Sequence, residues 1–122
     1  MKEAYVSLEV AKLLKEKGFE IITYMVYDNQ GNFDYQNCVC CNVDRMPCLY
    51  APTHQMTCAW LREKYKLHIT VDCIDVTEHG YIFTSKIVNM EYLRETKVED
   101  YFYSYEDAME AAIKYCLENL IK

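Results

Sequence analysis

The chain has 122 residues, of which 52% are hydrophobic and 26% charged, and its net charge is −6. These values fit one globular domain with a substantial core, so residues 1–122 are predicted to form a single domain. The negative charge argues against nucleic acid as a ligand, because such binders neutralise phosphates with clustered lysine and arginine. No apolar run of about 18 residues is present to span a membrane. No signal peptide is recognised at the start, so we expect a cytoplasmic protein.

Residues 7–17 are predicted to form an amphipathic helix. Ser7 is a suitable N-cap, since its hydroxyl accepts a hydrogen bond from the free amides of the first turn. Val10 and Leu14 belong to one apolar stripe. Gly18 suits the left-handed conformation that often follows the end of a helix.

The next segment predicts a β-hairpin. Residues 19–27 are rich in Ile, Val, Tyr and Thr, which favours a buried strand. Residues 28–32 have the Asp, Asn and Gly composition of a turn, and a second strand is expected near 33–42. Residues 43–52 contain both prolines of the chain and are expected to be irregular.

A second helix is predicted over 53–66, with Thr53 as its N-cap and Trp60 as a buried anchor. Two β-rich runs follow at 68–76 and 81–88, and they are predicted to pair as an antiparallel hairpin. The apolar alternation changes phase after Cys73, which indicates a β-bulge.

The last predicted helix begins at a capping box, Ser104 to Asp107, and keeps apolar residues at helical spacing as far as Ile121. The order of elements is then α-β-β-α-β-β-α. Two hairpins favour a mostly antiparallel sheet, so the sequence predicts an α+β fold with a four-stranded sheet and helices on one face.

Catalytic motifs are not recognised. The sequence has no glycine-rich phosphate loop, G-x-S-x-G or H-E-x-x-H, and its three histidines lie in different segments. Asp72 and Asp75 are three residues apart in a predicted strand, which would place them on opposite faces. Cys58, Cys73 and Cys116 lie in apolar-periodic segments and are predicted to be small buried hydrophobes.

A cluster of cysteines followed by a histidine is the most unusual chemical feature. Its members are Cys38, Cys40, Cys41, Cys48 and His54. Thiolates and imidazole are the ligands that zinc prefers, so a structural zinc site is one hypothesis. The spacing departs from the usual C-x₂₋₄-C knuckle, and free thiols in a reducing cytoplasm are the alternative.

Tyrosine is the second unusual feature, with 12 residues in the chain. Residues 91–122 hold −4 of the net charge of −6, and several tyrosines lie among these acids. Tyrosine is common in protein interfaces because it offers a large, rigid ring with a polar tip. The candidate docking residues for a protein partner are Tyr92, Glu99, Asp100, Tyr101, Tyr103 and Tyr105. Alternatively, the rings cover the edge of the core.

Three stretches together resemble a family of small uncharacterised proteins from gut anaerobes, their phages and other mobile elements. They are SLEVAKLLKEKGF at 7–19, APT at 51–53 followed by WLRE at 60–63, and YEDA at 105–108 before two alanines. The resemblance implies a cytoplasmic protein encoded by a phage or prophage, and it implies no activity. The cysteine cluster is not part of the resemblance.

The sequence therefore favours a non-enzymatic protein-binding domain or modulator. A small structural-zinc domain is one alternative, and a protein that sequesters or hydrolyses a small ligand such as a nucleotide is another. A homodimer is also expected, because a sheet covered on one face leaves the other face or an edge free. Tyr24, Val26, Cys40 or Tyr81 could supply that contact.

Overall fold

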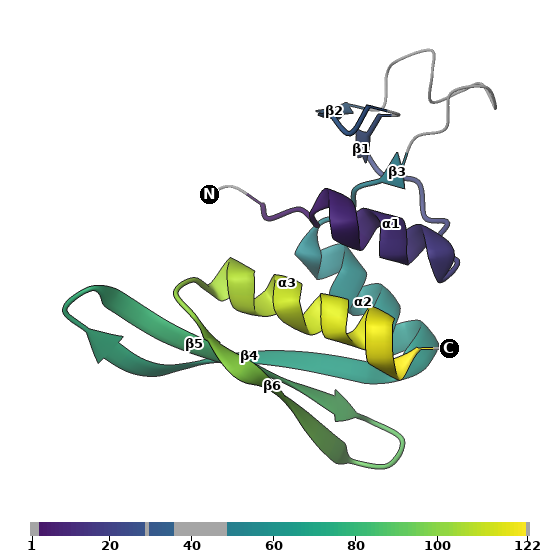
Figure 1. Cartoon of the computed structure of the whole chain (residues 1–122). Helices are drawn as coiled ribbons and strands as arrows, with labels where there is room; N and C mark the ends of the chain where they lie inside the picture. Colours follow the sequence, from purple (N-terminus) through teal and green to yellow (C-terminus); the bar gives the residue numbers. More distant parts are fainter. Residues whose placement is uncertain (1–2, 29, 36–48, 122) are drawn as a thin grey trace. The chain divides into compact units, whose positions relative to one another are not determined.

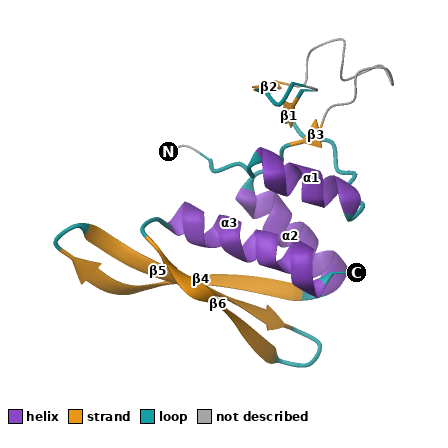
Figure 2. Ribbon diagram, viewed as in Figure 1, coloured by secondary structure: helices purple, strands orange, loops and turns teal. Residues whose placement is uncertain are grey.

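A computed structural model describes residues 3–28, 30–35 and 49–121 (Figure 1). The chain divides into two compact units, Met1–His54 and Gln55–Lys122, which are described here separately. Each unit contains a three-stranded antiparallel sheet, and helices accompany both sheets (Figure 2). The prediction of one domain over 1–122 is not tested by this division and stays a prediction.

The first helix of unit 1, α1 (Leu8–Glu16), confirms the helix predicted at 7–17. Ser7 is its N-cap, and the Ser7 hydroxyl accepts a hydrogen bond from the Val10 amide at 3.2 Å. Gly18 follows the helix with a φ of +86°, a conformation that only glycine adopts at no steric cost. The apolar stripe is buried at Val10 and Leu14, which anchors the helix to the core of its unit.

The sheet of unit 1 has the order β2-β1-β3, with β1 at Met25–Tyr27, β2 at Phe33–Tyr35 and β3 at Leu49–Tyr50. The predicted turn joins β1 to β2, and the Asp28 carboxylate closes it by accepting hydrogen bonds from the amides of Gln30 and Asn32. The hairpin is therefore confirmed. Residues 36–48 lie outside the described part of the chain, so the full length of the predicted second strand is not described.

Two expectations for unit 1 are wrong. The strand predicted at 19–27 begins only at Met25, because the hydroxyl of Thr23 accepts a hydrogen bond from the Ala51 amide and donates one to the Met25 carbonyl. These side-chain bonds compete with extension of the strand, although the Ala51 amide also donates to the Met25 carbonyl at 3.0 Å. The segment predicted to be irregular contains β3, which pairs with β1 through Tyr50 and Leu49.

Unit 2 carries the helix α2 (His54–Tyr65), which begins at the division and confirms the helix predicted at 53–66. Its buried side chains include Leu61 and the predicted anchor Trp60. The ring of Tyr65 packs edge-on against Trp60 at a centroid distance of 5.2 Å.

The sheet of unit 2 has the order β4-β5-β6, with β4 at Leu67–Thr77, β5 at Gly80–Asn89 and β6 at Arg94–Phe102. The predicted β4–β5 hairpin is confirmed, and so is the bulge, which shifts the register between Cys73 and Asp75. The bulge overturns one expectation. Asp72 pairs with Thr84 and Asp75 pairs with Ile82, two residues along, so both carboxylates lie on the same face.

The helix α3 (Tyr105–Tyr115) confirms the last predicted helix and continues into a π-helical turn at Cys116–Leu120. The hydroxyl of its N-cap, Ser104, accepts a hydrogen bond from the Asp107 amide at 3.0 Å. Figure 1 shows α3 lying along one face of the sheet, and it contacts all three strands. The covered face buries Ile69, Ser85 and Ile87.

The overall prediction of an α+β fold is confirmed, whereas the single four-stranded sheet is wrong. In the described residues the two predicted hairpins belong to separate sheets, and each sheet has a third strand, β3 or β6, that the sequence did not predict. β3 has only two residues. β6 consists mainly of charged residues and has Val98 as its one aliphatic side chain, so neither strand shows a clear hydrophobic period in the sequence. No helix in the described part of the chain is long and apolar enough to cross a membrane.

Candidate functional site

The hypothetical zinc ligands Cys38, Cys40, Cys41 and Cys48 lie outside the described residues. The fifth ligand, His54, is the first residue of α2 and is buried, and its backbone amide donates a hydrogen bond to the Ala4 carbonyl at 2.8 Å. Within residues 3–28, 30–35 and 49–121, no three His, Cys, Asp or Glu side chains gather closely enough to hold a metal ion.

The three described cysteines do not behave alike. Cys58 and Cys116 are buried as predicted, whereas Cys73 is exposed, which corrects the expectation that all three are buried. The bulge beside Cys73 and the absence of helix cover at this point of β4 explain its exposure. Burial raises the pKa of the Cys58 thiol to about 11 and that of Cys116 to about 12, so both stay protonated and are poor nucleophiles.

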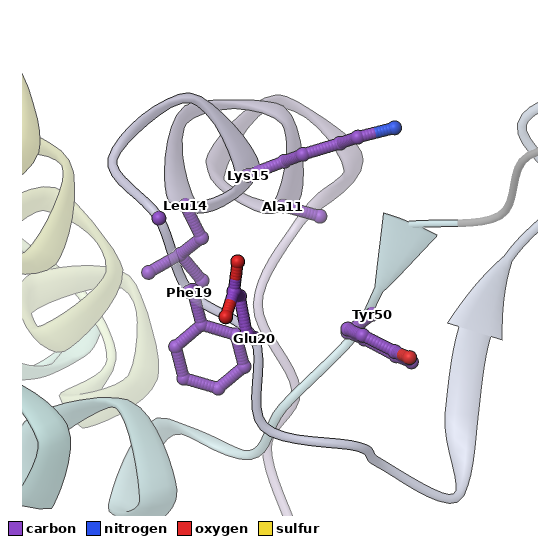
Figure 3. A pocket seen from close by; sticks show the side chains of 7 residues that line it. Ala11, Leu14, Lys15, Phe19, Glu20 and Tyr50 are labelled. Carbon is purple, nitrogen blue, oxygen red and sulfur yellow. The ribbon is translucent and has the colours of Figure 1, made fainter.

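A pocket of about 450 Å³ lies in unit 1 beside the end of α1 (Figure 3). Its lining combines an apolar floor with three polar side chains. The lining residues are Ala11, Leu14, Lys15, Gly18, Phe19, Glu20 and Tyr50. One ammonium, one carboxylate and one phenol give this pocket no nucleophile–base pair of the kind that acyl or phosphoryl transfer needs.

The most distinctive surface of the described chain lies at one end of unit 2. Residues 70–84 and 98–107 contain seven carboxylates and six aromatic rings, and neither segment contains a lysine or an arginine. We name these two segments the acidic aromatic end. The register brings them together, since Phe83 of β5 pairs with Phe102 of β6. The first lysines along the two strands, Lys86 and Lys97, face each other at the boundary.

All seven carboxylates of this end are solvent-exposed. They are Asp72, Asp75, Glu78, Glu99, Asp100, Glu106 and Asp107. The bulge in β4 and the capping box of α3 place acids from two distant segments at the same end of the sheet. Glu106 and Asp107 also lie in the first turn of α3, where the helix dipole stabilises negative charge. The local folding of this end is therefore compatible with its charge.

Three rings form a row across the acidic aromatic end. Tyr81 and Phe83 lie two residues apart on one face of β5, with ring centroids 6.4 Å apart. The ring of Tyr105, at the start of α3, meets Phe83 edge-on, also at 6.4 Å. Tyr81 and Tyr105 are exposed and Phe83 is half-buried, so the three rings lie at the boundary between the buried core and the solvent-exposed surface.

The β4–β5 hairpin extends beyond the first turn of α3, as Figure 1 shows. Ile74 and Val76 on this projecting part are exposed although they are aliphatic. Exposed apolar residues that adjoin rings and charges are characteristic of interaction surfaces. The acidic aromatic end thus offers both an apolar contact area and a strong negative potential.

The structure brings most of the predicted docking residues together. Tyr101 is 68% exposed and Tyr103 is 76% exposed, and both lie at the acidic aromatic end with Glu99, Asp100 and Tyr105. Tyr92 is equally exposed but lies in the turn between β5 and β6, at the opposite end of the sheet. The length of β6, roughly 30 Å at about 3.3 Å per residue, separates Tyr92 from the other members.

Sequence reasoning missed the contribution of the β4–β5 hairpin to this surface. Asp72, Asp75, Glu78 and Tyr81 join the predicted residues only through the antiparallel register of three strands. The available signal was charge segregation, because the acids of both segments lie in stretches without any lysine or arginine.

The residues expected to supply a homodimer contact are dispersed. Tyr24 and Tyr81 are exposed, whereas Val26 is 1% exposed in the central strand of unit 1 and is not available for a contact. Val26 is therefore not one of the residues that could supply the contact, and the homodimer itself stays a prediction. Cys40 lies outside the described residues.

Comparisons with protein-family models, with curated proteins and with solved structures found no match to this chain.

Proposed function

We propose that this chain is a non-enzymatic protein-binding domain and that its acidic aromatic end binds a lysine- or arginine-rich segment of a partner protein. One observation carries the proposal: seven exposed carboxylates and six rings share one end of unit 2, with no lysine or arginine in the segments that form it. Isolated surface acids only aid solubility, whereas segregation of this kind produces a directed negative field.

The chemistry of the surface supports a basic partner. The carboxylates would steer a cationic segment toward the surface and raise its association rate. The exposed rings would then hold ammonium or guanidinium groups by cation–π contact, which contributes about 0.5–2 kcal/mol for each well-placed pair. Tyr101, Tyr103 and Tyr105 lose little rotational freedom on binding, because each ring has only two side-chain torsions.

Cys58 and Cys116 give no support to a thiol enzyme, because both thiols are buried and protonated. The resemblance to phage-associated proteins agrees with a modulator that acts by occupying a host protein. In that setting the biological partner would be a host protein with an exposed basic segment.

A fluorescent peptide of about ten lysines is a suitable probe, with binding followed by anisotropy between about 50 and 300 mM NaCl. We expect salt-sensitive binding by the intact chain. The double variant Tyr101→Ala/Tyr103→Ala should bind about fivefold to tenfold more weakly at unchanged net charge, because two ring contacts are lost. Tyr24→Ala is the control, since Tyr24 is an even more exposed tyrosine, at 86%, and lies in unit 1.

A second pair of variants tests whether peptide binding depends on where the carboxylates lie or only on the net charge of the chain. Asp75→Asn/Glu78→Gln and Glu16→Gln/Glu20→Gln each remove two exposed carboxylates, the first from the acidic aromatic end and the second from unit 1. Only the first should weaken peptide binding. Equal weakening by both pairs would show that the peptide responds to total charge alone, and the proposal would then fail.

A further inference from the structure

The turn between β5 and β6 is hydrophobic and exposed. Met90, Tyr92 and Leu93 are all exposed, and Leu93 shows 80% of its surface to solvent. Three apolar or aromatic side chains in one four-residue turn are unusual, because such turns normally carry polar residues. The turn therefore resembles a contact element more than a simple connection.

Hydrogen bonds hold this turn in one conformation. The Asn89 side-chain oxygen accepts from the amides of Glu91 at 3.0 Å and Tyr92 at 3.3 Å. The Met90 amide donates to the Lys66 carbonyl at 2.8 Å, which ties the turn to the start of β4. Leu93 adopts a φ of +53°, in the left-handed region. A turn fixed in this way loses little conformational freedom when it binds.

The surroundings of the turn are basic. Residues 62–66 and 86–97 contain six basic side chains and three acidic ones. Glu95, one of the three acids, already forms an ion pair with Lys86 at 3.5 Å. We name the exposed turn with these segments the basic turn end. Its charge is opposite to that of the acidic aromatic end of the same unit.

The two ends cannot meet within one molecule. The exposed turn at 90–93 and the tip of the acidic aromatic end at the β4–β5 turn lie at opposite ends of β5, a ten-residue strand, and are therefore roughly 30 Å apart at about 3.3 Å per residue. Any attraction between them has to act between two copies. The apolar turn would fit the exposed rings and aliphatic side chains of the acidic aromatic end, and the flanking cations would face its carboxylates.

We propose that the chain self-associates head to tail, with the basic turn end of one copy bound to the acidic aromatic end of the next. The proposal rests on the proposed function, because it names a second copy as one basic partner of that same surface. Such a contact joins two different patches and is heterologous, so it leaves one free patch at each end of a dimer and permits longer chains. Complementarity of both charge and apolar area supports this occupant.

Sedimentation velocity on the full chain at about 25 mM and about 300 mM NaCl tests the proposal. We expect the weight-average mass to rise with protein concentration at low salt and to fall toward the monomer at high salt. Two variants then block one end each. Tyr92→Ser/Leu93→Asn removes the two most exposed apolar side chains of the turn, and asparagine tolerates the left-handed conformation. Asp75→Asn/Glu78→Gln/Tyr101→Ala alters the acidic aromatic end.

Each variant alone should be monomeric, because each lacks one of the two patches. An equimolar mixture should contain a 1:1 heterodimer, because each variant retains the patch that the other lacks. Circular dichroism and melting temperature check that both variants are folded. A mixture that stays monomeric would overturn the proposal, as would a turn variant that associates like the unaltered chain.

The lysine peptide separates the two proposals. If the turn variant binds the peptide normally and the unaltered chain stays monomeric at low salt, the head-to-tail contact is wrong and the protein-binding function stands. If neither protein binds the peptide, the surface is not a basic-segment site and both proposals fail.

Discussion

The β4–β5 hairpin has two halves that belong to one hydrogen-bonded pair of strands but differ in burial and in side-chain composition. In the half nearest α2, Leu67, Ile69 and Ile87 are buried beneath α3. In the other half, from Asp72 to Tyr81, the side chains are exposed and largely acidic, aliphatic or aromatic. The backbone hydrogen bonds between β4 and β5 therefore continue beyond the point where the side chains cease to be buried. One half of the hairpin belongs to the core, and the other half is solvent-exposed.

This contrast teaches that exposure at the projecting half is a property of the fold and does not reflect a lack of hydrophobic residues. Ile74 and Val76 are β-branched aliphatic residues like Ile69 and Ile87 in the covered half. They remain exposed because α3 starts only at Tyr105 and does not reach the tip of the hairpin. Substitutions in the two halves should have different consequences.

The largest expected difference concerns stability. Ile87→Ala should lower the free energy of unfolding by about 3 kcal/mol, because Ile87 is fully buried at the centre of the covered face. Ile74→Ala, the matched change in the projecting half, should alter it by less than about 0.5 kcal/mol. Urea denaturation of both variants measures this difference. Similar losses for the two variants would remove the distinction between the halves.

Thiol reactivity should also differ between the buried cysteines and the exposed cysteine of the projecting half. At pH 8 the raised pKa of Cys58, about 11 against a usual 9, lowers its thiolate fraction by about a hundredfold, and burial slows its reaction further. Cys73 is exposed in the projecting half and should be modified first. Iodoacetamide labelling followed by peptide mass spectrometry measures all three sites. Denaturant should equalise them, and early labelling of Cys116 would contradict the buried placement.

The pKa directions also predict how stability depends on pH. In the unfolded chain both thiols would titrate near 9, whereas the folded chain retains the Cys58 proton up to about 11 and the Cys116 proton up to about 12. The unfolded state therefore binds fewer protons above pH 9, and the free energy of unfolding should fall as the pH rises from 9 toward 11. The variant Cys58→Ala/Cys116→Ala should show a shallower fall in urea titrations over that range.

The smallest expected effect lies within the covered half. The Ser85 hydroxyl is buried and has no hydrogen-bond partner among the described residues. A buried hydroxyl without a partner costs about 1–3 kcal/mol. Ser85→Ala should therefore raise the free energy of unfolding by about 1 kcal/mol, measured by the same urea method. A decrease would show that the hydroxyl contributes a favourable interaction.

The elements that the sequence predicted well carry local stop and start signals. Ser7, Gly18 and Ser104 mark helix ends through bonds or torsions that depend only on neighbouring residues. β6 carries no such signal. It is an edge strand with few aliphatic residues, and only its pairing with β5 defines it.

The candidate site was predictable where it is continuous in sequence. Tyr101, Tyr103 and the neighbouring acids form one segment and are exposed, and their docking role stays a prediction. The contribution of Asp75 and Tyr81 depends on strand register, which the sequence does not define without knowing that β6 exists. Tyr92 was grouped with the others for the same reason, because a strand between them was not expected.

The lack of lysine and arginine in the acidic aromatic end has a practical consequence for experiments. Trypsin cleaves after lysine or arginine, so residues 67–85 and 98–113 contain no internal cleavage site and should survive digestion as two long peptides. Amine-reactive cross-linkers would also find no lysine side chain within this surface. Reagents that couple carboxylates are therefore the appropriate choice for trapping whatever binds there.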